Sequence, residues 1–378
     1  MGNAVRFVFL ALLWSACHVP AAMAQQTADG HGDTQPAAPP KPASDNKPYV
    51  IALPVVFYTP ETKLALGAGG VLGFRLGANR DDTRPSSLPF VVVYTLNKQT
   101  QILLKPDIYL PGNTYLVTGT VQFERMPQRF YGVGRTASDA TLEQYTPQTI
   151  EFQVGVKKRI AGHLWAGVQY QFQHTTMRQI DPGGQLAGGE VIGSRGGRIS
   201  GLGASVLFDS RDNVLFPRHG RYVKVAADRY APLFGSAFAY TSVEVDMRAY
   251  RPVRTADVIA GQVFLKTRNG ATPFYELPSL GGDSTMRGYY RGRYRDAAIV
   301  TAQAEYRAHI WKRLSAAAFA GMGEACPGLS RCSARGVLPS FGGGLRIKLD
   351  PKGGTNLRIE YAAGRNSKAF YMTVQEAF

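Results

Sequence analysis

The fold class that the sequence predicts is all-β: a transmembrane antiparallel β-barrel of about 16 strands. Three observations predict it. From Val50 onward, apolar and polar residues alternate with a period of two rather than 3.6. The alternating segments run about 9–13 residues, the length that a tilted strand needs to cross a bilayer, and they recur without a helical interruption. The chain also opens with an export signal. A soluble sandwich would alternate too, but only a closed barrel leaves no unpaired strand edge in lipid.

Composition excludes two other classes of protein. The 378 residues are 44% hydrophobic and 19% charged, which is not a disordered composition. A helical membrane bundle would need several apolar runs of about 20 residues, and the only long apolar run lies at the N-terminus. The chain is basic, with a formal net charge of +16. We attribute this charge to a basic lumen and to loops that face the phosphates of outer-membrane lipids and lipopolysaccharide.

The N-terminal segment has the pattern of a secretory signal peptide, predicted over residues 1–24. Arg6 precedes the apolar stretch Phe7–Trp14, and the small-residue site Ala22-Met23-Ala24 follows. A retained membrane anchor is less favoured, because the apolar core is short and no stop-transfer flank follows it. Residues 25–47 are rich in Pro, Ala, Gln and Asp and predict a disordered leader. That leader is too short for a periplasmic domain, so we expect residues 48–378 to form the barrel alone.

The predicted strands follow one another in a regular order. In the window Ala298–Ile310, for example, Glu305 falls on the polar face, which a barrel turns toward its lumen. With both ends periplasmic, the long connections 126–146, 177–197, 269–296 and 324–338 face outward, whereas 77–87 and 211–219 are long for inward turns. The sixteen predicted strands lie near 50–58, 64–76, 88–97, 99–110, 114–125, 147–160, 164–176, 198–210, 220–231, 236–250, 256–268, 297–311, 314–323, 339–349, 355–364 and 368–378.

Catalytic and nucleic-acid-binding signatures are missing from the sequence. It contains no G-x-S-x-G, H-E-x-x-H or G-x-x-x-x-G-K-[ST] motif, and its six His are scattered. We therefore expect no enzyme, no cofactor and no metal site. Basic residues are spread along the strands and loops rather than concentrated in an arm, so nucleic-acid binding is not expected either.

Two stretches stand out from the strand background. The first runs through a strand-turn-strand junction and contains Asp209, Arg211, Asp212, Asn213, Phe216, Pro217 and Gly220. The second lies in the outward connection 269–296 and contains Met286, Arg287, Gly288 and Tyr289. Together they resemble the BamA/TamA superfamily of outer-membrane barrels, also called the bacterial surface antigen family. The resemblance runs from about Pro48 to Phe378 and implies a Gram-negative outer-membrane protein, in a form without N-terminal periplasmic domains.

The resemblance implies that the loop carrying Arg287 folds into the barrel, where its guanidinium meets Glu305 on the inner wall. A guanidinium can hold a carboxylate through two parallel hydrogen bonds, and Gly288 permits the tight turn that aims it. The family often adds an Asp on the next strand. Gly321 stands at that place here. The attachment of the loop to the inner wall is therefore expected to be weaker, or to use Glu324 in place of the Asp.

Two further features belong to the C-terminal part of the chain. Cys326 and Cys332 lie in an outward loop of an exported protein, and we expect a disulfide between them rather than a metal site. The terminal Phe378 resembles the aromatic end by which outer-membrane barrels are recognised for insertion. Phe370, Met372 and Val374 share its predicted face, although Glu376 interrupts that face.

The function expected from the resemblance is assistance in inserting or translocating proteins or lipids at the outer membrane, with a separate periplasmic or outer-membrane partner protein. A passive pore for small solutes is the alternative. A structural barrel without transport is a third interpretation, and a barrel enzyme a distant fourth.

Overall fold

The computed structural model describes residues 48–59, 63–77, 82–96, 98–134, 137–349, 356–374 and 376–378. The predicted signal peptide and nearly all of the leader lie outside the described residues. From Asp45 to Phe378 the chain forms one compact unit. In the described part, no helix is long and apolar enough to span a membrane.

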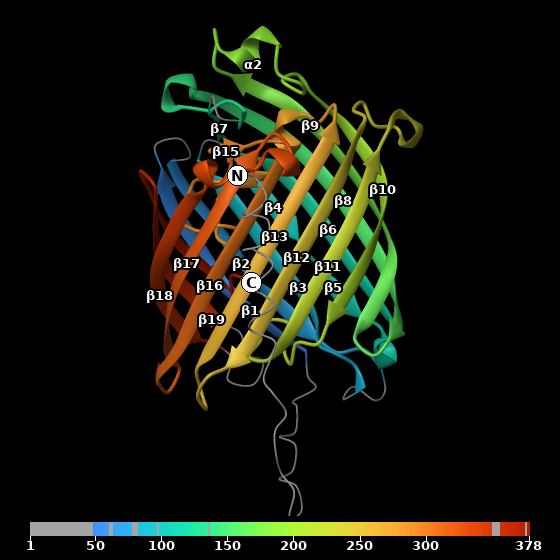
Figure 1. Cartoon of the computed structure of the whole chain (residues 1–378), viewed down its shortest axis with the longest axis vertical. Helices are drawn as coiled ribbons and strands as arrows, with labels where there is room; N and C mark the ends of the chain where they lie inside the picture. Colours follow the sequence, from blue (N-terminus) through green and yellow to red (C-terminus); the bar gives the residue numbers. More distant parts are fainter. Residues whose placement is uncertain are drawn as a thin grey trace, which may run out of the picture. The chain divides into compact units, whose positions relative to one another are not determined.

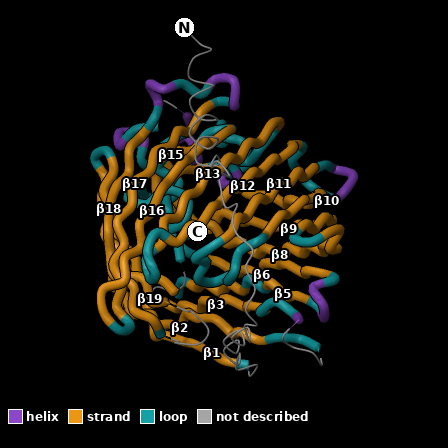
Figure 2. Tube along the Cα trace, turned by 60° about the horizontal axis from the view of Figure 1, so that its bottom comes forward, coloured by secondary structure: helices purple, strands orange, loops and turns teal. Residues whose placement is uncertain are grey.

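Long antiparallel strands make up most of this unit, wound side by side around a common axis (Figures 1 and 2). Each strand pairs with the next one along the chain, apart from short elements within loops. The strands are β1 (Tyr49–Thr59), β2 (Lys63–Phe74), β3 (Ser86–Thr95), β4 (Thr100–Leu104), β5 (Asp107–Tyr109), β6 (Tyr115–Arg125), β7 (Gln128–Phe130), β8 (Glu143–Ala161), β9 (Leu164–Ile180), β10 (Gly196–Asp209), β11 (Gly220–Tyr230), β12 (Tyr240–Pro252), β13 (Val258–Gly270), β14 (Ser279–Leu280), β15 (Tyr294–Arg295), β16 (Ala298–Trp311), β17 (Leu314–Cys326), β18 (Leu338–Lys348), β19 (Asn356–Gly364) and β20 (Ser367–Val374).

The predicted all-β class and strand number are confirmed. The main sheet of the described residues has 18 strands, of which β7 is a short addition to the end of β8. Strands β4 and β5 together occupy the place of one predicted strand, 99–110, so sixteen strand positions remain. The interruption between them falls at Lys105 and Pro106, where Pro106 has no N–H to donate to a ladder. Its carbonyl still accepts a hydrogen bond from Gly119 N–H at 2.9 Å.

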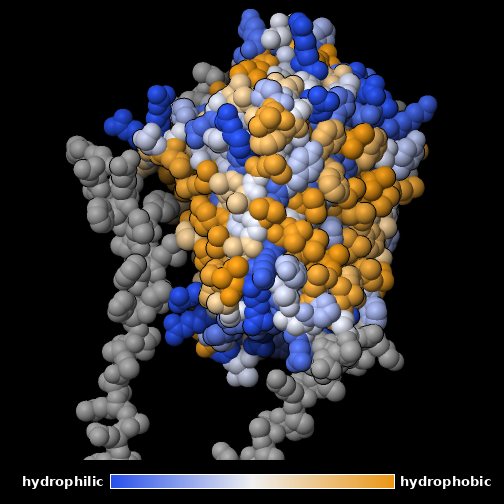
Figure 3. Space-filling model, turned by 90° about the vertical axis from the view of Figure 1, so that its right-hand side faces the viewer, coloured by the Kyte–Doolittle hydropathy of each residue, from blue (hydrophilic) through white to orange (hydrophobic). Residues whose placement is uncertain are grey.

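The two faces of each strand differ as the alternation predicts. On β8, Ile150 and Phe152 are exposed on the outside, and on β9 Val168 is 66% exposed. Trp165, of opposite phase on β9, is buried inside and packs with Tyr109. Figure 3 shows the resulting apolar surface around the middle of the barrel, with hydrophilic residues gathered toward the two ends. Such a belt is what lipid requires of the outer face.

The ends of the barrel are unequal. One end carries long connections with short helical elements, α2 (Gln185–Gly188) among them, and we call it the long-loop end (Figure 1). There an apolar cluster of Phe130, Tyr145, Leu186 and Phe274 joins three of the long loops. The opposite end, the short-turn end, has tight connections such as the one between β8 and β9.

One predicted strand is wrong at its end. Strand β20 stops at Val374, not at 378, and residues 376–378 lie in the lumen. Phe370 is 66% exposed on the outer face, whereas Phe378 is 3% exposed and buried against Tyr250 and Ala260. The physical reason is Glu376: a carboxylate continuing the phase of Phe370 and Met372 would face lipid, which is costly.

Candidate functional site

The long connection between β13 and β16 folds into the barrel and packs on its inner wall. Leu280, Met286 and Tyr289 of this loop are buried in one apolar cluster with Ile299 of β16 and Leu338 of β18. The loop therefore has a small core of its own, which fixes the position of the residue between Met286 and Gly288.

Arg287 is that residue, and its side chain is fully buried. Its Nη1 lies 2.6 Å from Glu305 Oε2 on β16 and 2.8 Å from Glu360 Oε1 on β19. Its Nη2 lies 3.4 Å from Gln303 Oε1, and the guanidinium stands 3.5 Å from the centre of the Phe319 ring. Because two carboxylates and an aromatic face surround the cation, the loop tip is held by charge as well as by packing.

The neighbours of Arg287 in the motif each make a specific contact. Gly288 adopts φ +99°, and a Cβ there would meet the Ala363 backbone carbon at 2.9 Å, so only glycine fits. Its N–H donates to Tyr371 Oη on β20 at 2.9 Å. Tyr289 Oη donates to the Pro339 carbonyl at 2.5 Å and accepts from Arg365 N–H at 2.7 Å. The loop tip is thereby attached to β18, β20 and the connection between β19 and β20.

Two further arginines extend the charge network around Glu305. Arg307 Nε lies 2.6 Å from Glu305 Oε1. Arg346 on β18 reaches both carboxylates, at 3.2 Å from Glu305 and 2.6 Å from Glu360. Each buried carboxylate thus has at least two cationic partners, which offsets the cost of removing it from water.

The tail formed by residues 376–378 joins the same network. Glu376 Oε2 lies 3.0 Å from Arg346 Nε and 3.5 Å from Arg307 Nε, and Glu376 Oε1 accepts from Asn356 Nδ2 at 2.8 Å. Burial raises the pKa of the Glu376 carboxyl, but Arg307 and Arg346 outweigh burial and hold this pKa below its usual range. The Phe378 carbonyl accepts from Arg307 Nη2 at 3.2 Å. Phe378 is therefore an internal residue in the folded barrel, and it does not share the outer face of Phe370 and Met372 as predicted.

The strand-turn motif forms a second buried cluster at the short-turn end. Asp209, at the end of β10, is fully buried and accepts from Arg211 Nε and Nη2, both at 2.9 Å. Arg84 approaches the same carboxylate from the other side at 3.1 Å. The guanidinium of Arg211 also stands 4.6 Å from the Tyr222 ring centre. One carboxylate thus anchors the turn to the wall through two arginines.

The rest of this motif shapes the turn itself. Asp212 Oδ1 accepts from the N–H groups of Asn213, Arg218 and His219, at 2.9–3.2 Å. Asn213 Oδ1 accepts from Leu215 and Phe216 N–H. The Pro217 carbonyl accepts a hydrogen bond from Arg307 Nη1 at 3.4 Å, and Gly220 has φ +107°. The connection 211–219 is long because it turns inward and reaches the Arg307 network.

Cys326, the last residue of β17, forms a disulfide with Cys332 in the loop that follows, with their Cα atoms 5.2 Å apart. Together with Glu324 they are the one group in the described residues with the spacing of metal ligands, but both sulfurs are bonded to each other. Glu324 does not contact Arg287 in the described structure, since its Oε2 accepts from Ser333 N–H at 2.7 Å. The expected substitution by Glu324 is therefore wrong, and Glu360 is the second carboxylate.

Sequence reasoning brought Arg287 and Glu305 together but missed Glu360, Arg307 and Arg346. The sequence nevertheless contains a signal that these residues face the lumen. Arg346 and Glu360 fall on the polar phase of alternating strands, as Glu305 does, and a charge on that phase must find a partner inside the barrel. Which strand supplies the partner depends on how far the loop reaches across the lumen, and alternation says nothing of that.

We expect Glu376→Gln to loosen the tail. The neutral amide loses its ion pairs with Arg307 and Arg346, although both arginines keep Glu305 as a partner, so the cost should be about 1–2 kcal/mol. The measurement is maleimide labelling of Ala377→Cys, since the two cysteines of the described residues, Cys326 and Cys332, are bonded to each other. Labelling should be slow in the Ala377→Cys parent and faster once Glu376→Gln is added. Equal rates would show that Glu376 does not hold the tail.

Comparison with known proteins identifies the family. A family model described as the Omp85 superfamily domain matches residues 65–370. Among solved structures, the chain is similar to BamA from Haemophilus ducreyi lacking POTRA domains 1-3, with a TM-score of 0.56 and 15% identity over 87% of this chain and 69% of that chain. It is also similar to CdiB from Acinetobacter baumannii (TM-score 0.54, 10% identity, 86% of this chain and 59% of that chain). CdiB from Escherichia coli gives a TM-score of 0.54 and 13% identity over 86% and 61% of the two chains.

No curated protein matches the sequence. The structural likenesses, all at low identity, concern the fold, whereas the family model covers most of the chain and confirms the predicted resemblance. This chain therefore belongs to the Omp85 superfamily and is a β-barrel of the Gram-negative outer membrane.

Proposed function

We propose that this barrel assists the insertion or translocation of proteins or lipids at the outer membrane, by opening between its first and last strands and without chemical catalysis. Its partners in this role are the outer-membrane lipids with lipopolysaccharide, and a periplasmic or outer-membrane protein. The observation that carries the proposal is the seam between β1 and β20.

The seam between β1 and β20 differs in its backbone pairing from the junctions between long strands that follow one another along the chain. Backbone ladders connect β1 through to β20 in chain order, but among the described residues no ladder joins β20 back to β1. Within β1, Pro54 has no N–H to donate. Unpaired strand edges are where an incoming strand can add itself to a sheet. The seam therefore offers a site at which a client strand or a lipid could enter.

The Arg287 loop supports the same proposal, because two of its contacts lie on β20, which borders the seam, and on the neighbouring β19. Arg287 reaches Glu360 on β19, and Gly288 N–H is bonded to Tyr371 on β20. The loop thus holds the last two strands against the lumen side of the wall. Its release would free the β20 edge of the seam.

Cysteine cross-linking tests this proposal. Val50 and Ala52 of β1, and Phe370 and Met372 of β20, are exposed on the outer face. If the two strands meet at the seam, cysteines at one site of each strand should cross-link. The cross-link should block insertion of a reporter barrel into liposomes. A matched control joins Val50 and Leu72, which already pair between β1 and β2, and should leave insertion unchanged. Full activity with a closed seam would contradict the proposal.

Hydrogen exchange gives a second test. Amides of β1 and β20 should exchange at least about tenfold faster than those of β12 and β13, which are paired on both sides, because local opening governs exchange. Equal protection at the seam and in these central strands would count against it.

A passive pore for small solutes is the second candidate function, and a polar cavity of about 330 Å³ in the lumen favours it. Conductance in planar bilayers distinguishes the two. A pore gives large, steady currents, whereas a barrel plugged by the Arg287 loop gives small and erratic ones.

A further inference from the structure

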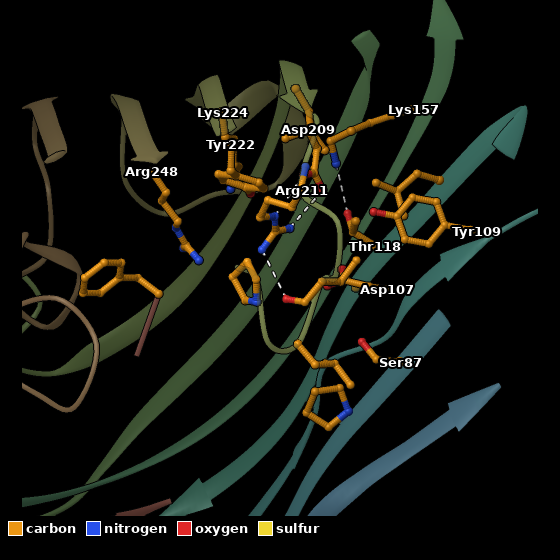
Figure 4. Close-up of a pocket in the computed structure, with 18 of the residues that line it drawn as sticks. Ser87, Asp107, Tyr109, Thr118, Lys157, Asp209, Arg211, Tyr222, Lys224 and Arg248 are labelled. Atoms are coloured by element: carbon orange, nitrogen blue, oxygen red, sulfur yellow. Dashed lines mark hydrogen bonds and ion pairs between the residues drawn. The ribbon is translucent and has the colours of Figure 1, made fainter. Parts of the chain in front are cut away.

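The lumen contains a cavity of about 330 Å³ on the short-turn side of the Arg287 network. The turn 211–219 and the tail border it on one side, and strands from β3 to β12 on the other. Its size is at the lower end of the range of pockets that hold small molecules. Figure 4 shows charged side chains from several strands converging on it, Lys157, Arg211, Lys224 and Arg248 among them.

Lys157 is the least satisfied of these cations. Its side chain is 97% buried, and its Nζ makes one hydrogen bond to the described residues, to Thr118 Oγ1 at 3.1 Å. An ammonium group has three N–H donors, so two remain for a ligand or for water. By contrast, Lys224 is paired with Glu244 at 2.9 Å.

Two guanidinium groups line the same space. Tyr222 lies between them, with its ring centre 4.6 Å from Arg211 and 4.8 Å from Arg248. The stack on Tyr222 fixes both planar groups, so that binding a ligand would cost them little side-chain entropy.

The carboxylates of the cavity are mostly occupied. Asp209 is held by Arg84 and Arg211, and Glu376 by Arg307 and Arg346. Asp107 is the exception, since its carboxylate accepts no hydrogen bond from the described residues. The cavity therefore has more free hydrogen-bond donors than free acceptors, and Asp107 is the acceptor that opposes an anion.

We propose that this cavity is a binding site for a small oxyanion, with Lys157 as its central donor. Arg248 is a second, weaker donor, because its Nε and Nη2 are already paired with Asp246 and only its Nη1 is left for a ligand. An anion there would fill the free donors of Lys157, and charge-assisted hydrogen bonds to a buried ammonium group are strong. The site borders the Arg287 network through Glu376 and Phe378 of the tail, but Arg287, Glu305 and Glu360 do not line it, and it does not depend on the transport role of the barrel.

Inorganic phosphate is the probe for this site, used on the full protein folded in detergent. Thermal unfolding is followed in phosphate and in chloride at equal ionic strength, because a ligand that binds only the folded state raises Tm. Lys157→Met should weaken the apparent phosphate affinity about tenfold or more, as loss of a charge-assisted hydrogen bond does. The matched control is Lys158→Met, whose side chain is exposed, and it should bind phosphate like the parent.

Asp107→Asn separates binding from structure, because it should strengthen phosphate binding several-fold: it replaces a carboxyl group, which opposes an anion, by an amide whose N–H groups can donate to it. A merely structural role of the cavity would not produce opposite effects from the two substitutions. The proposal is overturned if phosphate fails to raise the Tm of the parent, if Lys157→Met and Lys158→Met respond alike, or if Asp107→Asn weakens binding. Should Lys157→Met not fold, the Asp107→Asn result decides alone.

Discussion

Arg287→Ala should release the inward loop and destabilise the barrel by about 3–5 kcal/mol, as removal of one partner from a buried ion pair does. The guanidinium is fully buried between Glu305 and Glu360, so its loss leaves Glu360 with Arg346 and a distant Arg358 in a site without bulk water. Limited proteolysis should cut the loop 269–296 faster, and conductance in planar bilayers should rise as the loop leaves the lumen.

The matched control is Arg291→Ala in the same loop. Arg291 is exposed, and its removal should leave proteolysis and conductance close to those of the parent. Glu305→Gln and Glu360→Gln should resemble Arg287→Ala. Combining either with Arg287→Ala should cost less than the sum, because neighbours in one network are coupled. Simple additivity, or unchanged proteolysis in Arg287→Ala, would show that the ion pairs do not hold the loop.

The alternation of apolar and polar residues predicted the structure best where one face of each strand lies in lipid. It predicted the strands, and it put Glu305 inside, because charge on the outer face is costly along the whole belt. The same rule explains the end of β20. Glu376 has the phase of Phe370 and Met372, and this was the sequence signal that the strand stops before it.

Contacts across the lumen could not be predicted in this way. Glu305 and Glu360 are 55 positions apart, on strands that pair with different neighbours, and the loop alone brings Arg287 to both. The inward path of the tail is equally a result of tertiary structure, since Arg307 and Arg346 supply the charge that Glu376 requires. A pattern with period two records which face a residue takes, not which residue it meets.

Arg307→Ala should loosen the loop, the tail and the turn 211–219 together, because Arg307 contacts all three or their partners. Its Nε binds Glu305, the carboxylate that also holds Arg287. Its Nη2 donates to the Phe378 carbonyl, and its Nη1 to the Pro217 carbonyl. The two motifs of the sequence and the last residues of the chain thus meet at one buried guanidinium, and its loss should cost about 3–5 kcal/mol.

Three readouts test this convergence: proteolysis of the loop, maleimide labelling of Ala377→Cys, and thermal unfolding. All three should change in Arg307→Ala, whereas His309→Ala, two positions along the same strand and exposed, should change none. Arg307→Lys keeps the charge but cannot span the carboxylate and both carbonyls, so it should rescue stability in part and leave Ala377→Cys reactive. If Arg307→Ala makes Ala377→Cys reactive while the loop 269–296 stays protected from protease, the tail and the loop are held independently. Arg307 would then not couple the tail to the Arg287 loop.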